Sequence, residues 1–542
     1  MFKKSKIEKQ LNLLTTVSQH LNQGSYKRYT DTVAWHNVFF QQITSKIDEK
    51  IFSCLFSDKM GAPNAPIRQL IAMMILKEGH GWSDLELFEN CEFNLLVRKS
   101  LGIYDIDQTI PTASTYYLLR KRMVEYNQTH GIDLFAEVFK TITQSQIAEF
   151  EISGKSIRMD SKLIGSNIAF YSRYQIIHQT LCLYAKDRES EILKILNADQ
   201  QKQFMELIKE DSSKTVYRST KEQINKRLNE TGYLIYTIIN ICNSLEDSHF
   251  KTLKRVFKEQ YRIENDQKIE LRPKEEISAQ SVQSPHDTEC HYRNKNDQPI
   301  KGYSHNVTET CNDTGLNLIT DLQVEPASEA DNSFVIPSIE ETQKILPQKI
   351  ENMHTDGAYN SQANRDYAKQ NDINFYATGM QGAPGRYDLN NLAAEHTVLD
   401  KQTGELIQAT KAKNEKFRIE TASGYRYFDN QEIERSKLRL YLDQLPDEIK
   451  NKRNNVESTI YQLAYHLRKD KTRYRGHIKN RIWATLRCLW INLARITKNI
   501  TEICQRTITK LNNCLLANVL QITYFYIFTI TRLELNGKIR FE

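Results

Sequence analysis

Hydrophobic positions recur at helical spacing throughout residues 1–150. From Pro66 onward, the run IRQLIAMMILKEG places Leu70, Met73 and Met74 on one helical face. The next segment, GWSDLELFEN, carries a serine and, three residues later, a glutamate, which is the spacing of a capping box at the start of a helix. We therefore predict an all-helical N-terminal domain over residues 1–150.

Basic residues end the third predicted helix of this region, TASTYYLLRKRM, whose last turn contains Arg120 and Arg122. Several short helices with a basic last one are typical of a DNA-binding domain. A helical bundle with a basic surface explains this region equally well. Both interpretations stay open from these residues alone.

The spacing changes to alternation at SIRMDSKLIG, residues 156–165. Ile157 and Met159 lie on one face of a predicted strand over residues 156–160, and Arg158 and Asp160 lie on the other. A long, polar, helical stretch follows, and we interpret residues 274–300 as a surface loop. Residues 301–309 and 316–324 then flank the turn signal CNDTG and predict a hairpin.

Helices and strands alternate after this hairpin. The pattern predicts helices at 336–346 and 364–371, a strand at 373–379, strand-like segments within 386–440, and helix from about 445 to 510. A meander followed by strand and helix alternation is typical of an α/β fold in which a mixed sheet has helices on its faces.

Composition narrows the class only slightly. The 542 residues carry a net charge of +7, which permits binding to a polyanion without requiring it, and the length indicates several domains. Nine cysteines without a CxxC pair argue against a disulfide framework, so we expect a reduced, cytoplasmic protein. His286, Cys290 and His291 are the one zinc candidate, but they lack a partner pair.

Neither end of the chain predicts a membrane or secretory segment. The N-terminus is basic but has no apolar stretch, which argues against a secretory signal. Leu515–Ile530 has about the minimum length for a membrane span, but Asn518 and Gln521 interrupt it. We read this segment as a buried strand or a terminal helix, and we expect no membrane partner.

Three acids lie where predicted elements begin or end, and each has an ordinary structural explanation. Asp160 could cap a turn, Asp356 with Gly357 is a common turn dipeptide, and Glu457 is spaced for a helical ion pair with Arg453. Glu457 also stands at the edge of its helix's apolar stripe, not on the solvent side. A helix packed by that stripe would direct Glu457 toward the margin of the sheet.

Three clustered carboxylates repel one another, and divalent metal ions are the simplest compensation. Oxygen ligands favour Mg²⁺ or Mn²⁺ over zinc. Two such ions about 3.5–4 Å apart activate an attacking oxygen and stabilise a leaving oxygen at one phosphorus. We therefore predict that Asp160, Asp356 and Glu457 bind two ions for in-line displacement on a phosphodiester.

Basic residues follow Glu457 at high density in HLRKDKTRYRGHIKNR. Cations that neutralise phosphates give salt-dependent affinity for nucleic acid, although a solvated basic face is the simpler alternative. Lys162 is also well placed to contact a DNA backbone, though a solvated lysine is nearly as good an explanation. The candidate DNA-binding residues after Glu457 are Arg468, Lys471, Arg473 and Arg475.

Three blocks of the chain resemble the DDE transposases of bacterial insertion sequences, whose core has an RNase H-like fold. They are RMDSKLIGSNIA, the set KGYSHNV, LITDLQVEPASEADNSFV and HTDGAYNS, and RNNVESTIYQL with KTRYRGHIKNRIWATLRCLWINLARI. The stretch GAPNAPIRQLIAMMILKEG and the residues after it resemble the helical domain that commonly precedes this core. Together the resemblance covers most of residues 60–500.

The resemblance implies that Asp160, Asp356 and Glu457 are the catalytic triad and that Arg453 is the arginine of the family's Glu-helix signature. That signature usually also has a tyrosine and a lysine at the positions occupied here by Lys450 and Ala464. Its basic role would then fall on Arg468 or Lys471.

The resemblance also implies the domain organisation. Residues 1–150 would bind DNA, and 151–500 would form the catalytic core, with a helical insertion at 175–275, a β insertion at 386–440, and a tail at 501–542. The implied activity is cleavage of double-stranded DNA at the element ends and strand transfer to a target, by a homodimer. Two rivals remain: a nuclease that cuts without joining, and a non-catalytic DNA-binding derivative.

Overall fold

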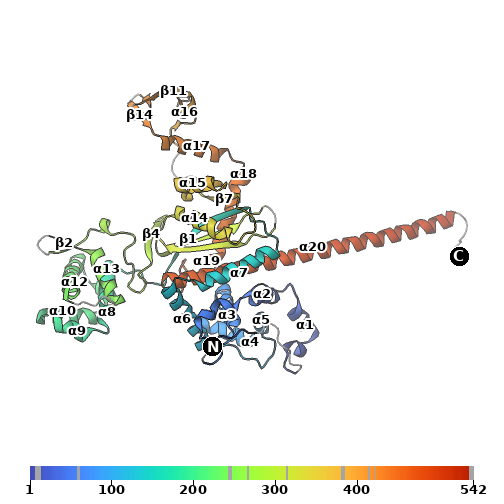
Figure 1. Cartoon of the computed structure of the whole chain (residues 1–542), viewed down its shortest axis with the longest axis horizontal. Helices are drawn as coiled ribbons and strands as arrows, with labels where there is room; N and C mark the ends of the chain where they lie inside the picture. Colours follow the sequence, from blue (N-terminus) through green and yellow to red (C-terminus); the bar gives the residue numbers. More distant parts are fainter. Residues whose placement is uncertain are drawn as a thin grey trace. The chain divides into compact units, whose positions relative to one another are not determined.

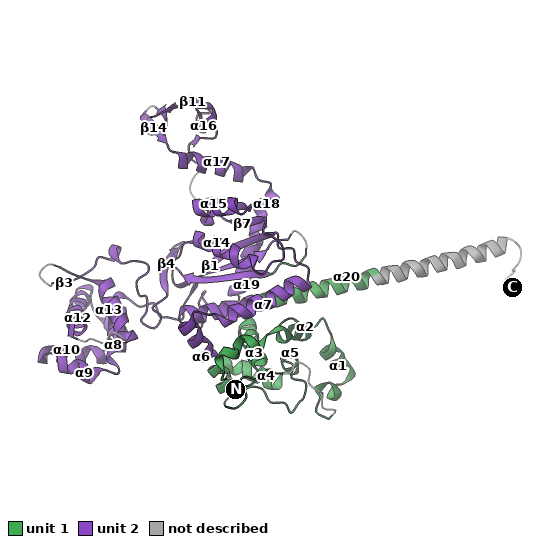
Figure 2. Cartoon of the chain, in the orientation of Figure 1, with its two compact units in different colours: residues 1–119, 313–318, 489–542 green, residues 120–312, 319–488 purple. Residues whose placement is uncertain are grey.

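The computed structural model describes residues 1–5, 14–57, 61–241, 247–264, 268–312, 315–379, 385–412, 416–421 and 423–535, without the side chains of 393 and 511–535. The chain divides into two compact units (Figure 2). The first comprises residues 1–119, 313–318 and 489–542, and the second comprises 120–312 and 319–488. The predicted functional domains, including a DNA-binding domain at 1–150, remain predictions.

The first unit is helical, as its hydrophobic spacing predicts. Glu86 donates its amide hydrogen to Ser83 Oγ at 3.2 Å, and Ser83 donates its own to Glu86 Oε2 at 2.7 Å, which confirms the capping box. The elements are η1 (Val17–His20), α1 (Gln23–Thr30), α2 (Trp35–Gln42), η2 (Thr44–Lys46), η3 (Glu49–Leu55), α3 (Ile67–His80), α4 (Asp84–Phe93), α5 (Leu95–Ser100) and the first turns of α6 (Ala113–His130).

Helix α3 forms the centre of this unit, and all its residues from Ile67 to Gly79 are buried. Part of α20 (His477–Leu535) packs against it through Trp490. A Cβ atom at Gly79 would lie 2.2 Å from the Trp490 ring, so glycine is needed for this close approach. His80 stacks on Trp82 with ring centroids 4.2 Å apart, which extends the aromatic contact.

The second unit contains a six-stranded mixed sheet, which confirms the predicted α/β class. Its strands are β1 (Ser156–Gly165), β4 (His291–Lys295), β5 (Gln298–Thr310), β6 (Ile319–Pro326), β7 (Asn352–Asp356) and β8 (Asn374–Thr378). The order is β4-β5-β1-β7-β8, with β6 also paired to β5. Strands β1, β5 and β6 pair antiparallel, whereas β1, β7 and β8 pair parallel, so the fold is RNase H-like.

Helices lie on both faces of this sheet (Figure 1). Contacts join α19 (Asn455–Ala464) to β1, α7 (Leu134–Glu149) and α14 (Val335–Gln343) to β6, and α15 (Gln362–Gln370) to β8. Short elements η5 (Asp331–Phe334), η6 (Gly357–Tyr359), α18 (Asp447–Asn451) and η7 (Lys452–Asn454) connect them. The predicted hairpin is present as β5 and β6, and residues 313–314 of its turn lie outside the described residues.

Strand β1 is longer than predicted, so Asp160 lies within the strand and not at its end. Strand β5 pairs with β1 from Ile157 to Gly165 on one side. On the other side, the parallel pairing with β7 covers only residues 156–158. The sequence showed no such extension, because Ser161 and Lys162 interrupt the apolar alternation and only the distant partner strand completes it.

The interpretation of residues 274–300 as a surface loop is wrong. After η4 (Lys274–Glu276) the chain enters a buried segment and then forms β4. Asp287 is 3% exposed and accepts hydrogen bonds from the Tyr303 hydroxyl at 2.7 Å and the Gly476 amide at 2.8 Å. The segment is polar because its side chains satisfy buried backbone and hydroxyl donors, not because water surrounds it.

The helical insertion has its own hydrophobic core, which includes Phe204, Ile235 and Leu253. Its helices precede a small two-stranded sheet, β2 (Tyr261–Ile263) with β3 (Ile269–Leu271). The helices are α8 (Arg173–Ala185), α9 (Glu189–Ile195), α10 (Ala198–Lys209), α11 (Ser212–Arg218), α12 (Lys221–Ile241) and α13 (Ser248–Gln260).

The β insertion forms two three-stranded sheets around a second small core. Its last strand ends at Phe428, and Asp429 and Glu432 then form a capping box that starts a helix at Asn430. The elements are β9 (Tyr387–Asp388), α16 (Leu392–Glu395), β10 (Thr397–Asp400), β11 (Leu406–Gln408), β12 (Thr410–Lys411), β13 (Phe417–Thr421), β14 (Gly424–Phe428) and α17 (Asn430–Gln444).

The helix predicted from about 445 to 510 is interrupted. Helix α19 ends at Ala464 and α20 begins at His477. Between them, Lys469, Asp470 and Gly476 have positive φ angles of 54°, 48° and 86°, which no helix accommodates. The basic residues of this segment therefore lie in a loop, not on one face of a helix.

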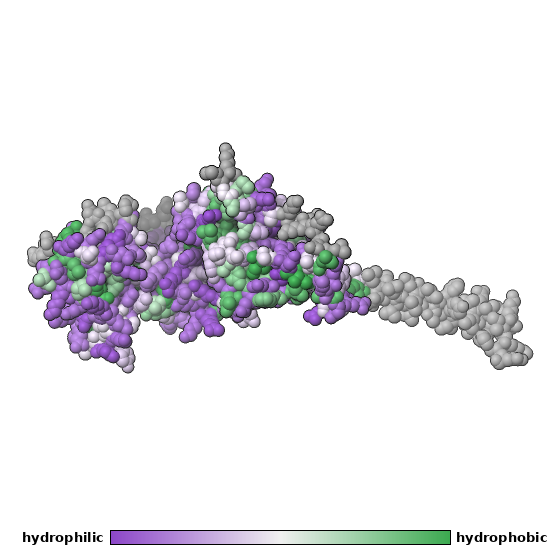
Figure 3. Space-filling view, turned by 90° about the horizontal axis from the view of Figure 1, so that it is seen from below, coloured by the Kyte–Doolittle hydropathy of each residue, from purple (hydrophilic) through white to green (hydrophobic). Residues whose placement is uncertain are grey.

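Within the part of the chain that is described, no helix is long and apolar enough to cross a membrane. The surface in Figure 3 is mostly hydrophilic, with hydrophobic side chains in small patches between hydrophilic ones. Leu515–Ile530, the one membrane candidate of the sequence, lies among the residues whose side chains are not described. The expectation that it does not span a membrane therefore stays a prediction.

Candidate active site

Asp160 projects from the middle of β1 beside the end of its pairing with β7. The Ser161 amide donates a hydrogen bond to Asp160 Oδ1 at 2.8 Å. Burial raises the pKa of Asp160 to about 6, and the neighbouring carboxylate of Asp356 adds to this rise. Lys295 and Arg453 act in the opposite direction, since their positive charges favour the ionised carboxylate.

Asp356 is the last residue of β7, where the strand leads into η6. The Gly357 amide donates to Asp356 Oδ1 at 2.5 Å. Gly379, which follows β8 with a φ of +73°, lies alongside, since a Cβ there would be 3.5 Å from the same oxygen. Two adjacent parallel strands thus place Asp356 at the sheet margin, near Asp160.

Arg453 connects Asp356 with Glu457. Its Nη1 lies 3.0 Å from Asp356 Oδ1, and its Nη2 lies 4.0 Å from Glu457 Oε1. The side chains of Asp356 and Glu457 are 40% and 65% exposed, so the arrangement opens to solvent. The structure therefore brings the three predicted acids and the predicted arginine into one region.

The donor chemistry of this region fits hard divalent ions. All three acids offer carboxylate oxygens, and Asp160 and Asp356 repel each other enough to affect the pKa of Asp160. Among the described residues, however, no three histidine, cysteine, aspartate or glutamate side chains stand close enough to hold a metal ion. The Arg453 guanidinium supplies the positive charge instead, by its ion pairs with Asp356 and Glu457. Arg453 would have to release these carboxylates before they could bind a metal ion together.

A fourth acid, Asp331 of η5, adjoins the strand that carries Asp160. Ser161 donates its hydroxyl hydrogen to Asp331 Oδ1 at 3.0 Å, and Arg293 Nη2 pairs with Asp331 Oδ2 at 3.1 Å. The spacing of Asp331 in the sequence does not indicate that it lies beside the acids. The only sequence feature that pointed to it is its place in LITDLQVEPASEADNSFV, one of the segments that resemble the transposases.

Tyr359 lies near the acids, three residues after Asp356. It is 1% exposed, and its hydroxyl donates to Asn306 Oδ1 at 2.9 Å. Burial raises its pKa well above the ordinary value, and nearby Asp160 contributes to the rise. Because this tyrosine is buried and hydrogen-bonded, its side chain is held in one position next to the site.

The basic loop, residues 468–475, runs along the end of β1. The Thr472 amide donates to the Gly165 carbonyl oxygen at 2.9 Å, and the Gly165 amide donates to the Asp470 carbonyl oxygen at 2.8 Å. Lys162 Nζ forms an ion pair with Asp470 Oδ1 at 3.0 Å. Two predicted DNA contacts, Lys162 and the loop, are therefore neighbours.

The other predicted DNA-binding residues differ in their surroundings. Lys471 is half-buried and donates to the Ile168 carbonyl oxygen, and burial lowers its pKa. Arg120, at the boundary of the second unit, lies with its guanidinium carbon 5.6 Å from the Tyr474 ring centroid. Arg122 is half-buried on the same helix, while three arginines of the loop are exposed: Arg468, Arg473 and Arg475.

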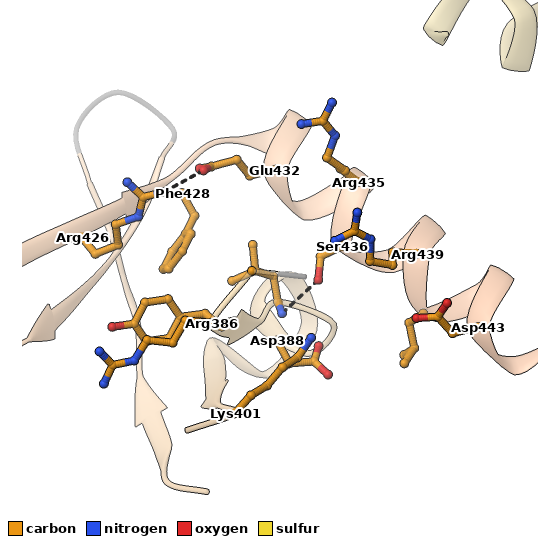
Figure 4. A pocket seen from close by; sticks show the side chains of 14 residues that line it. Arg386, Asp388, Lys401, Arg426, Phe428, Glu432, Arg435, Ser436, Arg439 and Asp443 are labelled. Atoms are coloured by element: carbon orange, nitrogen blue, oxygen red, sulfur yellow. Dashed lines mark hydrogen bonds and ion pairs between the residues drawn. The ribbon is translucent and has the colours of Figure 1, made fainter. Parts of the chain in front are cut away.

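A pocket of about 490 Å³ lies in the β insertion, with part of its wall formed by α17 (Figure 4). Arginine and lysine side chains line it, but acids pair with two of these cations. Arg426 Nη2 lies 2.9 Å from Glu432 Oε1, and Arg386 binds Asp400 with both its Nε and Nη2. This pocket contains none of the predicted catalytic residues.

Two family models match the chain, one in each unit's main region. A transposase DDE domain matches residues 277–493, and a transposase domain (DUF772) matches residues 28–122. Both matched models are transposase domains, and together they support a DDE transposase of insertion sequences. Comparison with curated proteins and with solved structures finds no match.

The DDE match has a consequence for the three acids. It includes Asp356 and Glu457 but begins after Asp160. The assignment of Asp160 therefore depends on the fold, in which β1 is central and pairs with the strand that ends at Asp356. Transposases of this family act on DNA and generally use divalent metal ions, so DNA transposition is the general function.

Proposed function

We propose that this transposase binds the ends of an insertion sequence, cleaves the DNA there in a metal-dependent reaction, and joins the freed ends to a target. The observation that carries the proposal is the convergence of Asp160, Asp356 and Glu457 around Arg453. The match of residues 277–493 to a transposase DDE domain supports the same reaction.

Asp160, Asp356 and Glu457 would hold two Mg²⁺ or Mn²⁺ ions. Bound ions of this kind supply Lewis-acid activation of the attacking oxygen and stabilise the leaving oxygen. Arg453 keeps Asp356 and Glu457 near each other until then, by an ion pair to each. Asp160 contributes a carboxylate whose charge is poorly compensated, and such a group gains most from a nearby cation.

The reaction has two displacement steps at phosphorus. In the first, water attacks the phosphodiester at the element end and the bond to the 3′ oxygen breaks, which leaves a 3′-hydroxyl. In the second, that hydroxyl attacks a target phosphodiester and displaces the target's own 3′ oxygen. Each step exchanges one phosphorus–oxygen bond for another, so no oxidant or nucleotide is consumed.

The basic loop supports binding of the DNA substrate. Arg468, Arg473 and Arg475 are exposed there, and the loop follows the strand that carries Asp160. Arginine contacts to phosphates position a duplex without reading its sequence. Two ends must be brought together for transposition, so we propose a homodimer in the active complex.

The test uses full-length protein and duplexes that carry the inverted repeats flanking the reading frame. We expect cleavage in Mg²⁺ or Mn²⁺ by the unmodified protein, and DNA binding without cleavage by Asp160→Asn. Pre-cut ends plus a target plasmid should give joined products. Hydrolysis without joining would identify a nuclease, and binding with neither activity would identify a non-catalytic derivative.

A further inference from the structure

A buried ion pair lies on the same face of the sheet as the acids. Arg158 of β1 and Glu309 of β5 are direct cross-strand partners. Arg158 Nε lies 2.6 Å from Glu309 Oε1, and the two residues are 6% and 0% exposed. An apolar pair of similar size is often at least as stable at such a position, so the pair calls for a role beyond stability.

The same two side chains also bind the segment that carries Arg453 and Glu457. Arg158 Nη1 donates to the Lys452 carbonyl oxygen at 3.0 Å, directly before Arg453. Glu309 Oε2 accepts a hydrogen bond from Thr459 Oγ1 at 2.6 Å, two residues after Glu457. The pair therefore holds this segment on both sides of the predicted catalytic residue.

Apolar packing alone would not fix the position of α19. The helix contacts β1 through a stripe that includes Val456, Ile460 and Leu463, which are nearly or fully buried. Hydrophobic contact is non-directional, and a shift of one residue moves a helix by about 1.5 Å along its axis. Hydrogen bonds have strict distances and angles, so two of them define one register.

We propose that Arg158 and Glu309 are positioning residues that set the register of the Arg453–Glu457 segment, so that Glu457 faces Asp160 and Asp356. The proposal rests on the proposed function, because it assigns these residues to the same metal and DNA site. Arg158 lies two residues before Asp160 on the same strand face, so one strand carries both a catalytic acid and the group that aligns its partner.

Thr459→Val is the sharpest test, because it removes one hydroxyl and keeps the side chain's shape. Thr320→Val is a matched control: Thr320 is a buried threonine of β6, 1% exposed, whose hydroxyl donates to the Thr308 carbonyl oxygen at 3.3 Å. Arg158→Lys is the second variant, since lysine keeps the charge but cannot match the guanidinium's fixed geometry.

Two measurements are made on each full-length protein: Mn²⁺ affinity by titration, without DNA, and the single-turnover cleavage rate as a function of Mg²⁺. We expect Thr459→Val and Arg158→Lys to weaken Mn²⁺ binding by about tenfold and to raise the half-saturating Mg²⁺ concentration similarly. Thr320→Val should leave both values unchanged, and circular dichroism confirms that all variants fold.

The outcomes separate the two proposals. Equal Mn²⁺ affinity in the unmodified protein and Thr459→Val refutes the positioning role, even if cleavage by Thr459→Val is slower. Equal losses in Thr459→Val and Thr320→Val refute it too, because general loosening would then explain both. An unmodified protein that binds Mn²⁺ but never cleaves refutes the proposed function alone, and one that does neither refutes both.

Discussion

Two clusters of arginine and acid lie on one face of β1, and they differ in how their charges are balanced. Around Arg158, the guanidinium meets the Glu309 carboxylate, and the Lys452 carbonyl oxygen and the Thr459 hydroxyl bond to the same pair. Around Arg453, one guanidinium meets Asp356 and Glu457, with Asp160 close by. The first cluster is buried and balanced, whereas the second is open and has excess negative charge.

The difference shows that one strand can carry a residue with a structural role and, beside it, a residue of the candidate catalytic site. A buried charge pair is stable only when its geometry is excellent and further hydrogen bonds satisfy its atoms. Arg158 and Glu309 form such bonds to Lys452 and Thr459. Perturbed carboxylates that lack such balance cluster at functional sites. Two residues apart on the same strand, Arg158 therefore belongs to a buried structural ion pair, whereas Asp160 belongs to a site that needs a cation.

The largest expected effect is on the open cluster. Asp160→Asn removes a charged oxygen ligand, and loss of several kcal/mol of transition-state stabilisation lowers the cleavage rate by about a thousandfold. DNA binding should change less than about twofold, because the fold and the basic loop are untouched. Gel-based cleavage and binding assays on the same duplex measure both quantities. Cleavage at the unmodified rate would remove Asp160 from the catalytic set.

The next effect is on the balanced cluster. Glu309→Ala leaves the Arg158 guanidinium buried without its partner, so the free energy of unfolding should fall by about 3–5 kcal/mol. Glu457→Ala, at a residue whose side chain is 65% exposed, should cost less than about 1 kcal/mol. Urea unfolding of both variants gives the comparison. Similar losses would show that the two clusters do not differ in the way described.

Much of the open cluster could be predicted from local patterns. The alternation at Ile157 and Met159 is local, and both residues are fully buried as it requires. The position of Glu457 at the edge of its apolar stripe is equally local, and α19 does contact β1. Asp356 is the last residue of β7, a strand that the local pattern did not predict, so its place at the sheet margin comes from the fold.

The strand alternation places Arg158 on the face of Asp160, but its pairing with Glu309 could not be predicted, because the two residues are far apart in sequence. Arg158 and Glu309 are separated by 151 residues, and no periodicity relates them. The same limit explains the errors in the fold. Strand β1 continues past Asp160 because β5 pairs with it, and the polar segment around Asp287 is buried because Tyr303 and Gly476 bond to it.

A smaller effect is the pH dependence of the free energy of unfolding, which distinguishes the two clusters without DNA. Folding raises the pKa of Asp160 to about 6, so the folded state binds this proton more tightly than the unfolded chain. The ionised carboxylate therefore lowers stability above about pH 6, and this cost disappears below about pH 4. In metal-free buffer, Asp160→Asn should add about 1–2 kcal/mol at pH 8 and almost nothing at pH 4. Thermal unfolding at both pH values measures it, and a gain independent of pH would contradict the assignment.

The smallest effect tests the third charged residue of this face, Lys162, whose ion pair with Asp470 is partly exposed. Such pairs contribute about 0–1 kcal/mol, so Lys162→Met should barely change stability. If Lys162 exchanges Asp470 for a phosphate, the substitution should reduce the slope of log affinity against log salt by about 1. Asp470→Asn is the matched control, because it frees the lysine and should strengthen DNA binding. If the salt slope is unchanged in Lys162→Met and the DNA affinity is unchanged in Asp470→Asn, Lys162 forms only the ion pair and does not contact DNA. The exposed arginines of the basic loop would then be the DNA contacts of this region.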